Sequence, residues 1–215
     1  MSALPVNPPS APLLRALGAL VIAAALPACS LLGGHKEPPR QFAPVAHVAA
    51  DASWPRVDAQ LTIAPPQIIR SYDTLRIAVR PTPQELQVYK DGVWAQRPSE
   101  MLTASLLRTF EDAGRLRAVA RDSSGVSGDF RLLLDIRRFE ADYAGAATPS
   151  ATIEVSAKLV RKDGTDVVAS RTFLQAEPAT DTTVPQVVDA FDRALARVDR
   201  DIAGWTLASM AHAHN

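Results

Sequence analysis

The sequence predicts an α+β domain: a mostly antiparallel sheet with two main helices packed on one face, following an N-terminal signal and a flexible tether. Several segments alternate apolar and polar residues, which is the period of a half-buried strand. Two other segments repeat apolar residues every three to four positions, as a helix with one buried face does. Because the order is strands, helix, strands, helix, the helices are expected to gather on one face of the sheet.

The strand segments are recognised by their alternation and by the turn residues between them. Asp91-Gly92 and Asp163-Gly164 favour tight hairpin turns, so the segments flanking each pair are expected to be antiparallel neighbours. Leu133 interrupts the alternation of one long segment, which predicts a central strand covered on both faces for part of its length. The expected strands are residues 60–64, 75–80, 86–89, 93–94, 117–121, 129–143, 153–159 and 167–174.

Both helices carry terminal signals. Pro98-Ser99-Glu100 opens the first helix, and Gly114 is placed to end it. The second helix follows the capping oxygens of residues 181–183 and tolerates Pro185 in its first turn. Exposed apolar surface on this long helix would mark an interface with a partner or with a second copy of the chain. Its apolar stripe comprises Val184, Val187, Val188, Phe191, Leu195, Val198, Ile202 and Trp205.

The single cysteine, Cys29, ends the motif Leu26-Pro27-Ala28-Cys29 after an apolar run. Arg15 precedes this run, and residues 16–26 contain no charged side chain. A short positive region, an apolar core of about ten residues and a small residue before the cut are typical of a secretory signal. We therefore predict a signal peptide over residues 1–28 and acylation of the Cys29 thiol. The alternative is a plain signal peptide with an incidental thiol.

The signal also predicts a compartment. Ser30 follows the acylated cysteine, and in the sorting rule of enteric bacteria the absence of Asp at this position favours the outer membrane, with the chain facing the periplasm. Residues 29–60 are rich in Pro, Ala and Gly, and we expect them to form a flexible tether. Such a tether could span about 100 Å when extended. The folded domain is expected over residues 61–210.

Composition excludes several classes of protein. The chain contains 23 Lys and Arg residues and 23 Asp and Glu residues, so it lacks the basic excess of a nucleic-acid binder or a polybasic membrane domain. Metal-ligand clusters are absent, and neither a metal nor a cofactor is expected. His212 and His214 near the C-terminus could supply two metal ligands, but no further ligands accompany them in the sequence. A solvated terminus is therefore expected. Ser127 lacks the Gly-x-Ser-x-Gly spacing of a hydrolase nucleophile. We therefore predict that the protein is not an enzyme.

Charged residues of both signs crowd one predicted strand. Asp135, Arg137, Arg138 and Glu140 lie within six positions of the segment 129–143. Cross-strand ion pairs on a solvated sheet face are one interpretation. A polar docking strip for a partner protein and a pair of catalytic acids are the alternatives. Trp94 and Trp205 are expected to fill the core where sheet and helices meet, with lipid or ligand contact as the alternative.

The order of these motifs resembles the ABC-type transport auxiliary lipoproteins, including the PqiC-like lipoproteins encoded beside MCE-domain transporters. The resemblance covers roughly residues 63–205 and follows pattern rather than one sharp motif. The residues after Trp94, Ala95-Gln96-Arg97-Pro98, depart from the family pattern. The resemblance rests on the strand at residues 75–80, the pair Val93-Trp94, the Pro-Ser-Glu helix start, the strand at residues 130–140 and the helix ending Ile202-Ala203-Gly204-Trp205.

This resemblance implies an accessory role in lipid transport. Members are anchored in the outer membrane and are thought to dock to an MCE-domain protein, while a separate permease and ATPase drive transport. The chain itself has no phosphate-binding Gly-x-x-x-x-Gly-Lys loop, which agrees with that division. The expected activity is thus docking that assists lipid traffic, with phospholipid as the expected cargo, and supports membrane integrity. An envelope hydrolase and a structural outer-membrane assembly lipoprotein are the alternatives.

Overall fold

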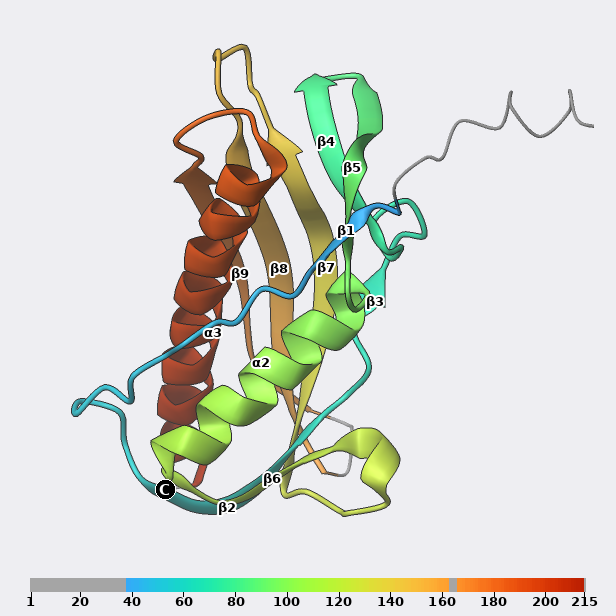
Figure 1. Cartoon of the computed structure of the whole chain (residues 1–215). Helices are drawn as coiled ribbons and strands as arrows, with labels where there is room; N and C mark the ends of the chain where they lie inside the picture. The colour runs from blue at the N-terminus through green and yellow to red at the C-terminus, as the bar shows by residue number, and fades with distance from the viewer. Residues whose placement is uncertain (1–37, 163–165, 215) are drawn as a thin grey trace, which may run out of the picture. The chain divides into compact units, whose positions relative to one another are not determined.

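A computed structural model describes residues 38–162 and 166–214, in which one compact unit begins at Pro39 (Figure 1). The unit contains a nine-stranded sheet and two long helices. The elements are β1 (Arg40–Phe42), β2 (Val57–Ile63), β3 (Gln67–Ile68), β4 (Arg76–Thr82), β5 (Glu85–Trp94), α2 (Pro98–Ala113), β6 (Leu116–Arg121), a 3₁₀ turn (Asp122–Ser124), β7 (Phe130–Asp142), β8 (Ser150–Arg161), β9 (Val167–Pro178) and α3 (Val184–His214).

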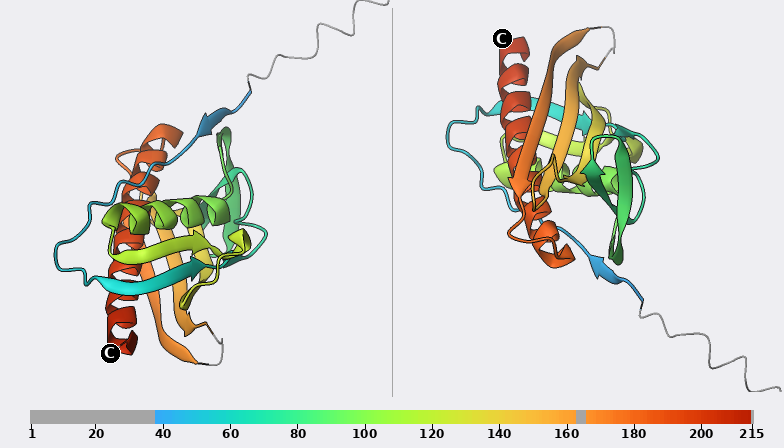
Figure 2. Two further views of the ribbon diagram at one scale, coloured as in Figure 1. Left: turned by 90° about the horizontal axis from the view of Figure 1, so that it is seen from below. Right: turned by 90° about the horizontal axis from the view of Figure 1, so that it is seen from above.

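Strand β7 is the centre of the sheet. One of its edges pairs with antiparallel β8 from Phe130 to Asp142, and β8 in turn pairs with antiparallel β9. The other edge receives β2, β3 and β4 in succession, each in a short parallel pairing. Beyond these, β6 joins β2, and β5 and β1 follow β4. The long ladders are antiparallel and both helices cover one face, so the predicted fold class is confirmed (Figures 1 and 2).

The turn predicted at Asp91-Gly92 is wrong. Strand β5 continues through these residues, and its register with β4 shifts between the pairs Arg76↔Val93 and Ala78↔Val88. The β4–β5 connection lies instead at residues 83–84. A Cβ on Gly92 would lie 2.7 Å from Val184 Cγ1, so glycine permits close packing there rather than a turn. The second pair, Asp163-Gly164, lies outside the described residues, although β8 and β9 are antiparallel as expected.

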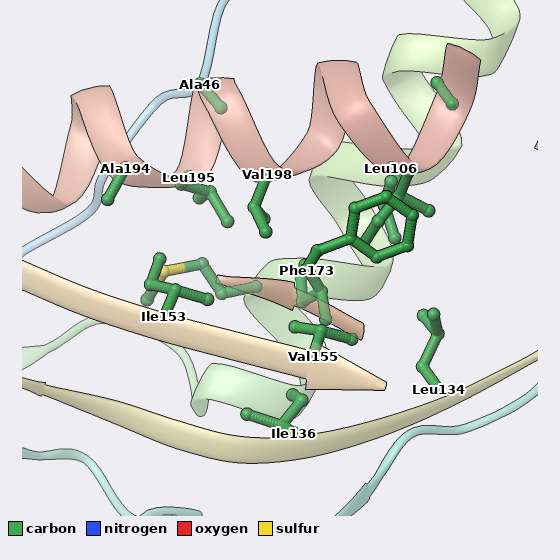
Figure 3. Packing of buried hydrophobic residues seen from close by; sticks show 14 of the residues in the cluster. Ala46, Leu106, Leu134, Ile136, Ile153, Val155, Phe173, Ala194, Leu195 and Val198 are labelled. Carbon is green, nitrogen blue, oxygen red and sulfur yellow. The ribbon is translucent and has the colours of Figure 1, made fainter. Parts of the chain in front are cut away.

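The hydrophobic core lies between the sheet and the two helices (Figure 3). Helix α2 ends as predicted, because Gly114 adopts a left-handed conformation (φ 56°) and donates its N–H to the Glu111 carbonyl. Trp94 is buried in edge-to-face contact with Phe139 and Phe191, which confirms its place in the core. The α3 stripe packs on this core through Val187, Val188, Phe191, Leu195, Val198 and Ile202, all of them buried.

Residues 43–56, here called the crossing segment, pack on the helices rather than forming the last part of a tether. Ala46 and Trp54 belong to the hydrophobic core, and the Val45 N–H donates to Asp192 Oδ1 on α3 at 2.9 Å. The Trp54 ring lies against Gly204 of α3, where an added Cβ would come within 2.7 Å of Trp54 Nε1. Glycine therefore makes room for the ring. The folded unit therefore starts about 20 residues before the boundary expected at residue 61, because apolar anchors are interspersed among the Pro and Ala residues.

Candidate functional site

The charged residues singled out in the sequence lie on β7, on the sheet face opposite the helices. Leu132, Leu134 and Ile136 point into the core, and the residues between them face outward. At Arg137 the strand carries one extra residue, since Ile136 pairs with Val155 whereas Arg138 pairs with Glu154. Such a bulge changes which face the following side chains occupy. It places Arg138, Glu140 and Asp142 on the outer face.

Glu140 is the centre of a buried ionic cluster on this face. Its side chain is fully buried, and Oε1 accepts hydrogen bonds from Arg80 Nε at 2.9 Å and from Arg138 Nε at 2.8 Å. Its Oε2 accepts from the Tyr72 hydroxyl at 2.6 Å, and Tyr72 in turn accepts from Arg80 Nη2 at 2.8 Å. Arg138 also pairs with Asp142. The cluster thus joins the β3–β4 loop and β4 to β7.

The electrostatics of the cluster favour charged side chains. Burial by itself would raise the pKa of Glu140, but hydrogen bonds from Arg80, Tyr72 and Arg138 outweigh it and hold the pKa below its usual value. The same carboxylate raises the pKa of Arg80. Burial and the bond to Glu140 raise the pKa of Tyr72. A carboxylate that stays ionised between two guanidinium groups is suited to holding strands together rather than to accepting a proton in catalysis.

Two of the predicted docking residues remain exposed beside this cluster. Arg137 Nε lies 3.4 Å from Asp135 Oδ2, and Arg137 Nη1 lies 3.8 Å from Glu154 Oε1 of β8. Both Asp135 and Arg137 keep about half of their side-chain area in solvent. They line a shallow hollow of about 220 Å³ that also includes Gln67, Leu133, Leu134, Ser156 and Lys158. This exposed charged strip, defined as Asp135, Arg137, Glu154 and Lys158, is the candidate docking site.

The structure therefore divides the four predicted docking residues into two pairs. Asp135 and Arg137 can be reached from outside, whereas Glu140 is buried and Arg138 is mostly engaged by Glu140 and Asp142. Tyr72 and Arg80 were missed as members of the cluster. They lie 68 and 60 residues from Glu140 in the chain, and the only signal was Arg80 at a polar position of an alternating strand. Cys29, the predicted lipidation site, lies outside the described residues.

Ser127 and His212 belong to no site among the described residues. Ser127 is exposed in the loop before β7. The His212 ring bonds to the Ala208 carbonyl in the last turns of α3, and the side chain of His214 lies outside the described ones. Within residues 38–162 and 166–214, no three His, Cys, Asp or Glu side chains are grouped as metal ligands. Over the same residues, no helix combines the length and the apolar character needed to cross a bilayer.

Comparison with known proteins identifies the family. The family model described as "ABC-type transport auxiliary lipoprotein component" matches residues 41–203, which is most of the chain and all of the sheet except its first residue. This chain is an ABC-type transport auxiliary lipoprotein. The family predicted from the motif order is thus confirmed, and it is a family of transport components rather than one defined by an enzymatic activity.

Individual proteins and solved structures are also similar to this chain. The crystal structure of protein XCC0632 from Xanthomonas campestris is 44% identical, with a TM-score of 0.79 over 81% of this auxiliary lipoprotein and 98% of the other chain. Protein bll6063 from Bradyrhizobium diazoefficiens is 31% identical over 72% of this chain, which spans only 41% of that relative's length. Protein CT253 from Chlamydia trachomatis, 7% identical with a TM-score of 0.53 over 73% of this chain and 99% of its own, shares the fold.

Proposed function

We propose that this auxiliary lipoprotein is held at the outer membrane by an acylated Cys29, faces the periplasm and assists an MCE-type ABC transport system in moving lipid between membranes. The match to the transport auxiliary family over residues 41–203 carries the proposal. The signal motif ending at Cys29 supports the anchor, and Ser30 supports the outer membrane. The protein would act by binding, while the permease and ATPase of the system supply the energy. Phospholipid is the proposed cargo.

The exposed charged strip is the surface that we assign to docking. Its residues project from β7 and β8, which pair from Phe130 to Asp142 on either side of the bulge at Arg137. This long ladder fixes the strands that carry the strip. The buried cluster around Glu140 fixes the neighbouring strands without using the exposed charges. Paired charges of both signs select a partner of complementary pattern more than they add affinity. A transport accessory that must recognise one partner needs this property.

The start of the folded unit at Pro39 limits the reach of the anchored protein. Only residues 29–38 remain between the acylated cysteine and the body. Their maximum extension is about 35 Å, far below the value of about 100 Å expected for a tether of residues 29–60. The body would then stay close to the membrane that holds it. A partner from the inner membrane would have to extend across most of the periplasm to meet it.

Affinity purification from detergent-solubilised envelopes tests the proposal. We expect mass spectrometry to find Cys29 as the acylated first residue, and an MCE-domain protein with its permease to co-purify. Arg137→Glu is expected to reduce this co-purification because it reverses a charge in the strip. Arg117→Glu is the matched control, since Arg117 is equally exposed and also contacts two carboxylates, but lies on β6.

The same purification separates the alternatives. Recovery without transporter subunits would contradict the transport role and favour a structural lipoprotein of the outer membrane. Equal losses for the two arginine variants would contradict docking through the strip while leaving the anchor and the transport role intact. An unmodified N-terminus would contradict the anchor. The mass of the purified complex would also show whether several copies of the chain associate.

A further inference from the structure

The β4–β5 arm, defined as residues 78–90, carries an unusual pair of exposed apolar residues. Leu86 and Val88 are 36% and 44% exposed and occupy alternate positions of β5, so they share one face. On the far edge of β5, β1 pairs only with Gly92–Trp94. Among the described residues no strand pairs with the part of that edge from Glu85 to Asp91. An open edge beside exposed apolar side chains indicates a contact surface.

The direction of β1 relates this arm to the membrane anchor. Strands β1 and β5 are parallel, with Arg40 opposite Gly92 and Phe42 opposite Trp94. The chain before Arg40 therefore enters the domain from the side on which β5 begins, which is the tip of the arm. Both views of Figure 2 show β1, in blue, next to the green arm. The part of the chain outside the described residues therefore joins the body at β1, on the side of the arm tip.

The lengths of the arm and the tether are comparable. From the level of Arg40 to the tip, β4 advances from Arg76 to Thr82, which corresponds to about 20 Å. The eleven steps from Cys29 to Arg40 span about 38 Å when fully extended. A flexible chain of that length has a root-mean-square end-to-end distance of about 18 Å. If residues 29–39 behave as such a chain, the arm tip lies about as far from Arg40 as the acylated end would.

We propose that the β4–β5 arm rests on the bilayer that carries the acyl anchor, with Leu86 and Val88 at the lipid interface. This inference depends on the proposed acylation of Cys29. The described exposed residues of the arm include Glu85 and Lys90 but no cluster of basic side chains, so the contact is apolar rather than a salt-sensitive attraction to anionic lipid. Resting on the arm would orient the body and present the charged strip on β7 in a fixed direction.

The exposed apolar residues of β9 provide a matched control. Leu174 is 56% exposed, more than either arm residue. Strand β9 lies at the opposite end of the sheet, with β4, β7 and β8 between it and β5. Four strand spacings correspond to about 19 Å. If exposure alone led to membrane contact, Leu174 would show it as strongly as Val88.

The test uses the full-length acylated protein in vesicles of phosphatidylethanolamine and phosphatidylglycerol. Val88→Cys and Leu174→Cys are labelled with a polarity-sensitive fluorophore, and quenching by spin-labelled lipid is measured. We expect a blue-shifted emission and several-fold stronger quenching at position 88 than at position 174. Both sites are exposed, so neither substitution should impair folding. Raising the salt concentration should leave the difference unchanged.

The unsubstituted protein separates the two possible failures. Its one cysteine is Cys29, so an acylated protein has no free thiol and takes up no dye. Dye on the unsubstituted protein would contradict the proposed anchor. Absence of dye there, with equal quenching at positions 88 and 174, would overturn the arm contact alone. Protection of position 88 only after addition of transporter subunits would also overturn it, because the arm would then bind protein rather than lipid.

Discussion

At the scale of single residues, Glu140 shows how charge replaces apolar packing on the outer sheet face. No helix of the described residues covers this face, yet the carboxylate is completely buried beneath Arg80, Arg138 and Tyr72. The guanidinium groups of both arginines bond directly to the carboxylate, and the two arginine side chains are themselves only 23% and 30% exposed. The cluster therefore supplies both the cover and the counter-charges for one buried acid.

We expect Glu140→Ala to lower the free energy of unfolding by about 3–5 kcal/mol, because it leaves the half-buried guanidinium groups of Arg80 and Arg138 without their shared counter-charge. Urea denaturation measured by far-UV circular dichroism would show the loss. Asp135→Ala on the same strand is the control, and its effect should stay below about 1 kcal/mol because the ion pair that Asp135 makes with Arg137 is exposed. Equal effects of the two substitutions would contradict a central role for Glu140.

Asp199 on α3 is also a buried acid, but unlike Glu140 it has no cationic partner among the described residues. Its side chain is inaccessible, and among the described residues neither of its oxygens has a hydrogen-bond partner of good geometry. Burial raises the pKa of Asp199 well above its usual value, and the Ser105 hydroxyl on α2 offsets only part of this rise. The folded protein therefore favours the neutral acid, and folding above the unfolded pKa requires uptake of a proton.

Because the pKa of Asp199 is higher in the folded than in the unfolded chain, we expect the free energy of unfolding to fall as the pH rises from about 4 towards that raised pKa. Asp199→Asn should remove that dependence and increase the free energy of unfolding at pH 7, because the amide is neutral in both the folded and the unfolded chain and needs no proton uptake. Urea titrations between pH 4 and pH 8 would measure both effects. Asp201→Asn, at an exposed position of α3, should leave the pH dependence unchanged. A variant less stable than the wild type at pH 7 would contradict the assignment.

At the scale of elements, the reliability of sequence reasoning depended on how local the signal was. The stripe of α3 and the glycine at the end of α2 lie within one segment, and both were predicted. The three parallel strands along one edge of β7 were not, because pairing between distant segments leaves no pattern in either. The Asp91-Gly92 pair misled for a similar reason. Glycine is needed there because the side chain of Val184, 92 residues later in the chain, packs too closely for a Cβ.

We expect Gly92→Ala to destabilise the domain by about 1–3 kcal/mol, the usual cost of overpacking a core. The new Cβ would lie 2.7 Å from Val184 Cγ1 and 3.0 Å from the Phe42 ring. Thermal unfolding would measure the loss. Adding Val184→Ala removes the closest atom, so the double variant should lose less than the sum of the two single variants. Strict additivity would show that the two positions are not in contact.

At the scale of the whole molecule, composition was a poor guide to where the domain begins. Residues 43–56 have the Pro and Ala content of a linker, yet they cross both helices and bury Ala46 and Trp54. Periodicity could not reveal this segment, because it is neither helix nor strand. The same limit applied to the candidate site, where exposed Asp135 and Arg137 could be named from the sequence while the burial of Glu140 depended on the bulge in β7.

Truncation of the N-terminus tests this boundary directly. A chain that begins at Pro39 retains every core residue of the described unit and should fold with the stability of the complete mature chain. A chain that begins at Leu61 loses β1, most of β2 and the crossing segment. Removing Trp54 alone would cost about 3–5 kcal/mol, and typical domains have only about 5–15 kcal/mol in total. We therefore expect the shorter chain to be unfolded or aggregated at 25 °C. Circular dichroism and size-exclusion chromatography of both chains measure this, and a cooperatively folded chain starting at Leu61 would show that residues 39–60 do act as a tether.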